Sequence, residues 1–212
     1  MTTNINHIPT LSLADQERDP ERFSQAFGAS FRRFGFAVVT DHGIDPKLID
    51  TAWKATRQLF ELPEEAKRRY YSAELAGQRG YTPFGTEIAK DAAHVDLKEF
   101  WHVGRDLPAG HRFRDHMPDN IWPTELAEFE AIFTDMYAAF DRAGNQLLSA
   151  IARYLGLAPD WFADKVDHGN SVMRLLHYPP IPADAPGIRA GAHGDINLIT
   201  LLLGAEEGGL QL

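Results

Sequence analysis

The sequence predicts an α+β fold, with helices and a few strands in the first part of the chain and consecutive strands after them. Apolar residues recur at helical spacing over 20–34, 46–60 and 123–155. From Ser171 the period changes to two, which is typical of strands that bury one face. Helices followed by consecutive strands indicate separate helical and sheet layers, with a β-sandwich or barrel towards the C-terminal end.

Length and composition fit one ordinary globular domain. The 212 residues are 44% hydrophobic and 24% charged. A net charge of −9 argues against a nucleic-acid-binding surface, and no stretch approaches the about 20 apolar residues of a membrane span. The absence of cysteine excludes disulfides and thiolate chemistry. Because 1–6 lack the features of a signal peptide, we expect a cytoplasmic protein. The charge and the lack of a long apolar stretch predict no nucleic-acid or membrane partner.

The first part of the chain carries recognisable element boundaries. Ile8–Leu13 is predicted to be extended, and Asp19 followed by Pro20 is typical of a helix start. Gly35 is predicted to end that helix before a buried strand over 36–40. The next elements are expected in this order: a helix over 45–60, a short helix over 62–71, a loop or irregular edge strand over 77–85, a strand over 96–103, a long connection over 104–122 and an amphipathic helix over 123–155.

The strand that begins at Ser171 carries long polar side chains on one face. Arg174 and Tyr178 fall on the same face, whereas His177 falls on the other. Inside a barrel, Arg174 and Tyr178 would need a polar partner, which a bound dicarboxylate or a buried carboxylate would supply. A structural ion pair for Arg174 is the alternative, and the residues alone favour neither reading.

His193 and Asp195 are the strongest candidates for metal ligands. One glycine separates them, so their side chains share a face in extended backbone. An imidazole and a carboxylate are two of the three ligands in the 2-His-1-carboxylate site of non-haem iron oxygenases. The apolar segment 196–203 is predicted to be a strand, beside which an unpaired buried carboxylate would be costly. A hydrogen-bonded pair without metal is the alternative, and His168 and His177 are third-ligand candidates of equal standing.

The other histidines are expected to be structural or solvated. His42 follows a strand in a turn, and His94, His102, His111 and His116 fall in polar stretches that are typical of the surface. The chain has no phosphate-binding glycine loop, no G-x-S-x-G elbow and no H-E-x-x-H motif. These other catalytic chemistries are therefore not indicated.

Five groups of short motifs follow one another in a characteristic order. They are F-G-F-A-V-V with D-H-G-I over 34–44, F-E-L-P-E-E-A-K over 60–67, R-G-Y over 79–81, D-L-K-E over 96–99, and M-R-L-L-H-Y-P-P with H-G-D-I-N-L-I-T-L-L-L between 173 and 203. In this order they resemble the 2-oxoglutarate/Fe(II)-dependent oxygenases of the isopenicillin N synthase-like family. The resemblance spans essentially all 212 residues.

The resemblance implies a double-stranded β-helix, or jelly roll, packed against N-terminal helices and a long helix. Residues 1–115 would form an N-terminal α/β region, and 116–212 would form the long helix and the first part of the core, within one structural domain. The family's distal histidine and its R-x-S pair for 2-oxoglutarate would lie beyond Leu212. We therefore expect the sequence to be truncated at its C-terminal end.

The resemblance also implies an activity that depends on Fe(II), 2-oxoglutarate and O2, and that hydroxylates or otherwise oxidises a small molecule. An Fe(II) oxidase of the same fold that does not use 2-oxoglutarate, and a catalytically silent jelly-roll binding module, are the alternatives. Six residues take roles by this resemblance: His193 and Asp195 as iron ligands, Arg174 and Tyr178 in binding the co-substrate, and Tyr81 and Phe100 in lining the substrate pocket.

Overall fold

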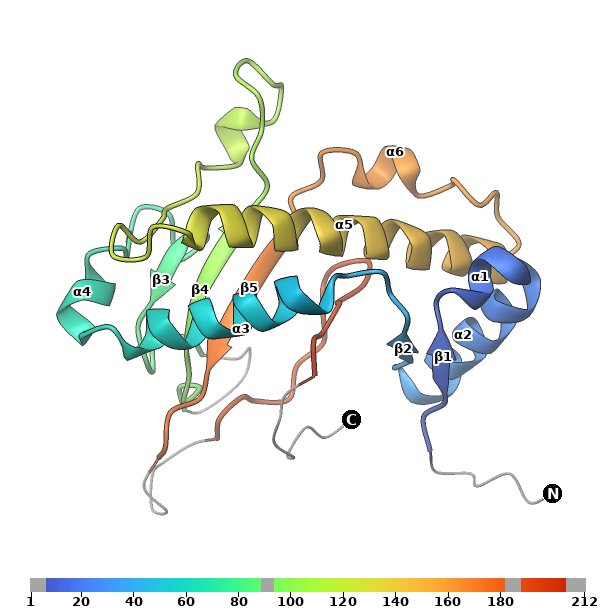
Figure 1. Ribbon diagram of the computed structural model, residues 1–212, viewed down its shortest axis with the longest axis horizontal. Coiled ribbons are helices and arrows are strands. Elements are labelled where there is room, and N and C mark those ends of the chain that lie inside the picture. Colours follow the sequence, from blue (N-terminus) through green and yellow to red (C-terminus); the bar gives the residue numbers. More distant parts are fainter. Residues whose placement is uncertain (1–6, 89–93, 182–187, 205–212) are drawn as a thin grey trace. The chain divides into compact units, whose positions relative to one another are not determined.

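The computed structural model describes residues 7–88, 94–181 and 188–204 (Figure 1). The chain divides into two compact units that interleave along the sequence. Both units cross the boundary between 115 and 116 that the sequence suggested. Unit 1 contains Met1–Asp45, Ala138–Asp167 and Ile199–Leu212, and unit 2 contains Pro46–Tyr137 and His168–Leu198.

Unit 1 combines a short parallel strand pair with helices. Strand β1 (Thr10–Ser12) pairs with β2 (Val38–Thr40), so that Leu11 lies opposite Val39. Its helices are α1 (Asp15–Arg18), α2 (Pro20–Phe34), the part of α5 (Phe129–Tyr154) that follows Tyr137, and α6 (Ala163–Val166).

Helix α2 has the boundaries that the sequence predicts. The Asp19 carboxylate accepts a hydrogen bond from the Arg22 amide at 3.1 Å, and Pro20 occupies the first turn, where no amide donor is needed. At the other end Gly35 takes a left-handed φ of 70° and its amide donates to the Phe31 carbonyl. Both predicted caps are therefore confirmed.

The core of unit 1 lies between α2 and the second part of α5. Phe23 and Phe27 of α2 are buried there together with Leu147 and Ala150 of α5 and with Leu13. Burial of large apolar side chains of this kind, about 1.5–3 kcal/mol each, accounts for the helical spacing of apolar residues in the sequence.

Unit 2 is organised around one antiparallel sheet in the order β3-β4-β5, drawn side by side in Figure 1. The central strand β4 pairs with both neighbours, so His102 lies opposite both Gly80 and Arg174. The elements of this unit are α3 (Pro46–Glu61), α4 (Glu64–Arg68), β3 (Gly80–Thr82), β4 (Glu99–Gly104), a short 3-10 helix (Arg114–His116), the start of α5 and β5 (Val172–His177).

The strand register divides this sheet into two faces, because directly opposed residues share a face and successive residues alternate. The Glu99 face carries Glu99, Tyr81, Trp101, Leu175 and His177, and contacts with Phe60 of α3 and Phe129 of α5 lie on it. The Arg174 face carries Arg174, Phe100, His102, Thr82 and Leu176. Helices of unit 2 thus cover the Glu99 face.

Two sequence predictions of element boundaries need correction. The long helix begins at Phe129 rather than at Pro123. Residues 123–129 form two successive turns, in which the Leu126 amide donates to the Pro123 carbonyl and the Phe129 amide donates to the Leu126 carbonyl. The strand predicted over 196–203 is absent, since neither sheet in the described part of the chain includes it. Ile199 and Leu201 still pack on the core of unit 1, so the period of two is kept without strand pairing.

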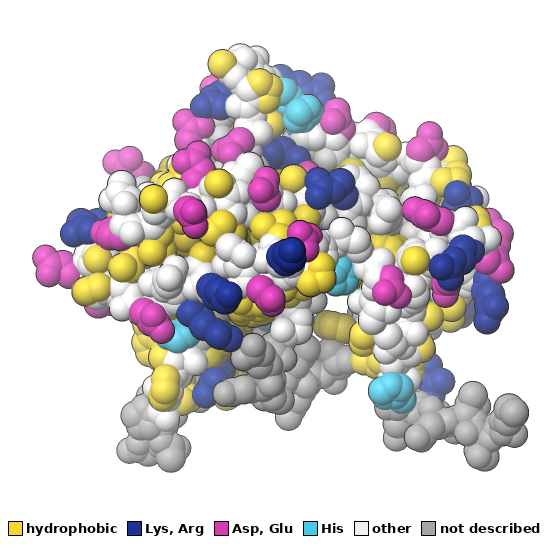
Figure 2. Space-filling model, in the orientation of Figure 1, with side chains coloured by type: hydrophobic (Ala, Val, Ile, Leu, Met, Phe, Trp, Pro, Cys, Tyr) yellow, Lys and Arg dark blue, Asp and Glu magenta, His cyan; other side chains and the backbone are white. Residues whose placement is uncertain are grey.

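The mixture of helices and antiparallel strands agrees with the predicted α+β class. No helix in the described ranges is both long and apolar enough to cross a lipid bilayer. On the face shown in Figure 2, acidic and basic side chains are interspersed over the described residues.

Candidate active site

The predicted ligands His193 and Asp195 lie together in unit 2. The His193 Nε2 atom is 3.7 Å from Asp195 Oδ1, and the two side chains are 60% and 48% exposed. The other ring nitrogen, His193 Nδ1, is 2.9 Å from the Gly191 carbonyl oxygen. A carbonyl can only accept a hydrogen bond, so Nδ1 carries the proton in the neutral ring. The lone pair is therefore on Nε2, on the side of Asp195.

This arrangement fits two ligands of one metal ion. Metal-ligating histidines usually donate their second ring nitrogen to a carbonyl or carboxylate, as His193 does to Gly191. Metal bonds from such ligands are about 2.0–2.2 Å long, so a 3.7 Å separation between Nε2 and Oδ1 lets one ion contact both atoms. Among the residues that the structure describes, no third His, Asp, Glu or Cys completes a metal-binding group.

The segment that leads into His193 is tied to the chain just before β4. The Gly191 amide donates to Asp96 Oδ1 at 3.0 Å, and the Leu97 amide donates to the Ile188 carbonyl at 3.0 Å. We call 188–195 the ligand loop. Asp96 of the D-L-K-E motif thus holds the same glycine whose carbonyl holds the His193 ring.

Asp96 also begins a row of alternating charges. Its Oδ2 atom is 2.8 Å from Lys98 Nζ, Lys98 is 2.6 Å from Glu87, and Glu87 is 3.3 Å from Arg174. Burial alone would raise the pKa of Asp96, but hydrogen bonds from Lys98 and the Gly191 amide outweigh it and keep the pKa below its usual value. The carboxylate is therefore charged at neutral pH, and the row links the ligand loop to Arg174.

Arg174 is held by more than this ion pair. Its Nε donates to His102 Nε2 at 2.6 Å, and its guanidinium carbon lies 4.5 Å from the centre of the Phe100 ring. The opposite ring nitrogen, His102 Nδ1, is 2.6 Å from the Gly77 carbonyl. A neutral His102 that donates from Nδ1 and accepts at Nε2 satisfies both contacts. Arg174 therefore has a fixed orientation on its face of the sheet.

Burial lowers the pKa of His102 to about 4, with the neighbouring Arg174 charge as the next cause. His102 is only 8% exposed. The expectation that His102 is a solvated surface histidine is thus wrong. His102 lies in the central strand β4, where its Nε2 accepts a hydrogen bond from Arg174 of β5.

The predicted pocket residues Tyr81 and Phe100 lie on opposite faces of the sheet. Phe100 is on the Arg174 face, whereas Tyr81 is fully buried on the Glu99 face and its hydroxyl donates to Glu99. Burial and this hydrogen bond raise the pKa of Tyr81. The two rings therefore face opposite sides of this sheet. Tyr178, the other predicted co-substrate residue, lies half-buried one position after β5.

A second buried network surrounds Glu99. Lys67 Nζ is 2.7 Å from Glu99 Oε2, and His177 Nδ1 is 2.7 Å from Glu99 Oε1. His177 also stacks on Phe60, so it is engaged away from the ligand loop. The other proposed third ligand, His168, has its ring 4.6 Å from that of His111. Neither histidine therefore joins His193 and Asp195.

These contacts show which residues the sequence reasoning missed. Glu87, Asp96 and Lys98 were not singled out, although D-L-K-E was noted as a motif. The available signal was the period of two: Asp96, Lys98 and Phe100 alternate with Glu99. That alternation places the Asp96 and Lys98 side chains on one side of the chain and the Glu99 side chain on the other.

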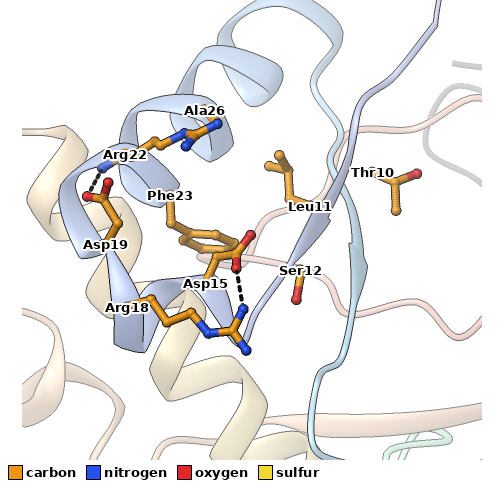
Figure 3. Close-up of a pocket in the computed structure, with 9 residues that line it drawn as sticks. All are labelled: Thr10, Leu11, Ser12, Asp15, Arg18, Asp19, Arg22, Phe23 and Ala26. Atoms are coloured by element: carbon orange, nitrogen blue, oxygen red, sulfur yellow. Dashed lines mark hydrogen bonds and ion pairs between the residues drawn. The ribbon is translucent and has the colours of Figure 1, made fainter.

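Unit 1 has a surface hollow of about 470 Å³ between β1 and the starts of α1 and α2 (Figure 3). Among its charged side chains Arg18 pairs with Asp15, and the Asp19 carboxylate accepts from the Arg22 backbone amide. All six sequence-predicted site residues belong to unit 2. The hollow is therefore lined by none of the predicted site residues.

Comparison with known proteins places these features in a family. Residues 8–125 match the family model of the N-terminal region of non-haem dioxygenases, described for morphine synthesis. A 2-oxoglutarate-dependent dioxygenase of Monascus ruber is 31% identical, with 100% of this chain and 69% of that protein aligned. A proline hydroxylase of Petromyces alliaceus is 34% identical over 91% of this chain and 61% of its own length.

Solved structures agree. A putative 2OG-Fe(II) oxygenase family protein from Caulobacter crescentus matches with a TM-score of 0.81 and 53% identity, over 90% of this chain and 61% of that one. Neurospora crassa T7H in complex with alpha-KG shares the fold, with a TM-score of 0.74 and 24% identity over 90% of this chain and 62% of that one. The chain spans about three fifths of the length of the first curated relatives. It belongs to the 2-oxoglutarate/Fe(II)-dependent oxygenases of the isopenicillin N synthase-like family.

Proposed function

We propose that this protein is an Fe(II)- and 2-oxoglutarate-dependent oxygenase that uses O2 to hydroxylate or otherwise oxidise a small molecule. The observation that carries the proposal is the His193–Asp195 pair, in which a ring nitrogen with a lone pair faces a carboxylate 3.7 Å away. Family membership supplies the expectation of iron and co-substrate. When bound, the metal with its co-substrate supplies the oxidising chemistry.

In this proposal the chain's own residues bind and orient. His193 and Asp195 hold the metal, with a family histidine outside the described residues as the third ligand. Arg174, fixed by His102 and Glu87, and Tyr178 bind the co-substrate from the Arg174 face. A guanidinium presents several fixed donors, which suits a carboxylate.

The substrate would enter over Phe100 on the same face. Phe100 is buried beneath the Arg174 guanidinium, so it would form the apolar floor under that cation. Tyr81 lies on the other face of the sheet, where its hydroxyl donates to Glu99. The sheet β3-β4-β5 would be part of a double-stranded β-helix, the core architecture that the family resemblance implies.

The test is metal binding and co-substrate turnover by the intact protein. We expect one Fe(II) per chain under anaerobic titration and, with O2 admitted, conversion of 2-oxoglutarate to succinate. His193→Ala should lower metal affinity at least about 100-fold, because it removes a direct ligand. His111→Ala, a histidine of unit 2 whose ring contacts Phe113 and His168, is the control and should keep wild-type affinity.

Three results would contradict the proposal. Undiminished 2-oxoglutarate turnover by His193→Ala would exclude this residue as a ligand. Substrate-dependent O2 uptake without succinate would indicate the iron oxidase alternative. Failure of the wild-type protein to bind Fe(II), Mn(II) or Co(II) would favour a binding module without metal.

A further inference from the structure

We propose that Asp96 is a positioning residue for the metal site: its carboxylate fixes Gly191, and Gly191 in turn fixes the His193 ring. The proposal rests on the proposed function only in that His193 is taken as a metal ligand. Asp96 itself touches neither metal nor substrate in this assignment. It acts through the ligand loop, 188–195.

The first argument is how the two oxygens of Asp96 are used. Oδ2 accepts from Lys98 Nζ at 2.8 Å, and Oδ1 accepts from the Gly191 amide at 3.0 Å. A carboxylate present only as the partner of a buried lysine would need no bond to a loop almost a hundred residues away. Because one oxygen bonds Lys98 and the other bonds Gly191, the Asp96 side chain connects Lys98 to the ligand loop.

The second argument is burial. Asp96 is only 4% exposed, and burying a charge is costly unless the charge is paired and hydrogen-bonded. Lys98, equally buried, satisfies the charge and is itself held by Glu87. The carboxylate is therefore rigidly placed, and a rigid acceptor can define where the Gly191 amide lies.

The third argument is continuity from Asp96 to the imidazole. The Gly191 amide donates to Asp96 Oδ1 at 3.0 Å, and the Gly191 carbonyl accepts from His193 Nδ1 at 2.9 Å. A second tie, between the Leu97 amide and the Ile188 carbonyl, fixes the start of the same loop. The Nδ1 contact determines which ring nitrogen keeps the lone pair. Asp96 thereby influences the orientation and the tautomer of His193.

The chain offers a matched control in Glu99. It lies three residues further on, is also 4% exposed and also pairs with a buried lysine, Lys67, at 2.7 Å. Its hydrogen bonds run to Lys67, Tyr81 and His177, none of which belongs to the ligand loop. Removing Glu99 should disturb the fold as much as removing Asp96 does, without releasing Gly191.

The experiment compares Asp96→Ala, Asp96→Asn and Glu99→Ala in the intact protein. Fe(II) affinity is measured anaerobically, hydrogen exchange across 188–195 is measured without metal, and stability is measured by urea unfolding. We expect Asp96→Ala to weaken Fe(II) binding about 10-fold, the lower end of the effect of residues that orient metal ligands, and to speed exchange of the Gly191 amide. Asp96→Asn keeps one acceptor oxygen, which can serve Lys98 or Gly191 but not both, so its losses should fall between those of the wild type and Asp96→Ala. Glu99→Ala should leave both unchanged in the folded protein.

A double variant, Asp96→Leu/Lys98→Met, removes the acceptor without leaving an unpaired buried charge. It should reproduce the losses of Asp96→Ala even where the single variant folds poorly. Wild-type Fe(II) affinity in either acceptor-free variant would overturn the proposal. If the wild-type protein binds no metal, the proposed function fails, whereas unchanged Gly191 exchange in Asp96→Ala overturns this inference alone.

Discussion

The two faces of the β3-β4-β5 sheet are supported by similar chemistry used in different ways. Each network pairs a buried carboxylate of the D-L-K-E motif with a buried lysine: Glu99 with Lys67, and Asp96 with Lys98. The Glu99 network joins helix α4 to the sheet and ends within the packed layer. The Asp96 network continues to Arg174 and to the ligand loop.

The difference shows that a buried ion pair is not by its nature either structural or functional. What distinguishes the two pairs is the remaining hydrogen-bonding capacity of the carboxylate. Glu99 uses it on Tyr81 and His177, side chains of the same sheet, whereas Asp96 uses it on the main chain of a loop. The Glu99 hydrogen bonds stabilise the packing on one face of the sheet, whereas the Asp96 hydrogen bond positions the ligand loop. The following substitutions test this division, in order of expected effect.

The largest effect should come from Lys67→Met. It leaves Glu99 buried without its cation, and breaking a buried pair in this way costs about 3–5 kcal/mol. We expect the free energy of unfolding in urea to fall by that amount while Fe(II) affinity of the remaining folded protein is unchanged. A selective loss of metal affinity would show that the Glu99 network also supports the site.

The pH dependence of stability should reveal His102 next. Its folded pKa of about 4 lies below the unfolded value near 6.5, so between these pH values the unfolded chain binds more protons. Stability should therefore fall as pH drops from 6.5 towards 4, by up to about 3 kcal/mol from this group. Arg174 and Arg79 oppose the protonated form, and Glu87 favours it.

His102→Gln is the matched variant for that measurement. Glutamine does not titrate, so the difference in unfolding free energy between wild type and variant should change across pH 4–6.5 and level off above pH 7. A difference independent of pH would mean that His102 titrates normally in the folded protein.

Tyr81→Phe should have an intermediate effect. It removes the hydroxyl that donates to the Glu99 carboxylate, and a hydrogen bond to a charged group contributes about 1.5–3 kcal/mol. Substrate KM should stay at the wild-type value because Tyr81 lies on the Glu99 face. A raised KM with unchanged stability would restore Tyr81 to the pocket, as the sequence first suggested.

The smallest effect should come from Glu64→Gln. The Glu64 side chain is half exposed and pairs at 2.8 Å with Arg68, which is also exposed, and exposed pairs contribute about 0–1 kcal/mol. Urea unfolding should shift by less than about 1 kcal/mol. A larger loss would place Glu64 inside the Glu99 network rather than at its edge.

Local signals in the sequence predicted much of the fold and part of the site. The caps of α2 depend on residues within a few positions of each other, so Asp19, Pro20 and Gly35 could be read directly. The i, i+2 spacing of His193 and Asp195 likewise predicted that their side chains lie close together, and they are 3.7 Å apart. The alternation along β5 also placed Arg174 and His177 on opposite faces.

What the sequence did not predict depends on pairing between distant segments. The 196–203 segment has the composition of a strand, but a strand exists only where a neighbour completes its hydrogen bonds, and no described strand does so. His102 was misjudged because its surroundings are set by β5 and by Gly77, neither of which is near it in sequence. The Asp96 contact with Gly191 likewise spans 95 positions.

Gly191 gives the ligand loop a thermodynamic consequence. Glycine loses more backbone freedom on ordering than any other residue, and fixing one residue costs about 1–2 kcal/mol. The peptide groups on both sides of Gly191 are hydrogen-bonded, one to Asp96 and one to His193. That entropy is thus lost when the protein folds rather than when the ion binds. Since 1.4 kcal/mol is tenfold in affinity, a site ordered in advance would bind its metal about ten times more tightly than the same ligands on a loose loop.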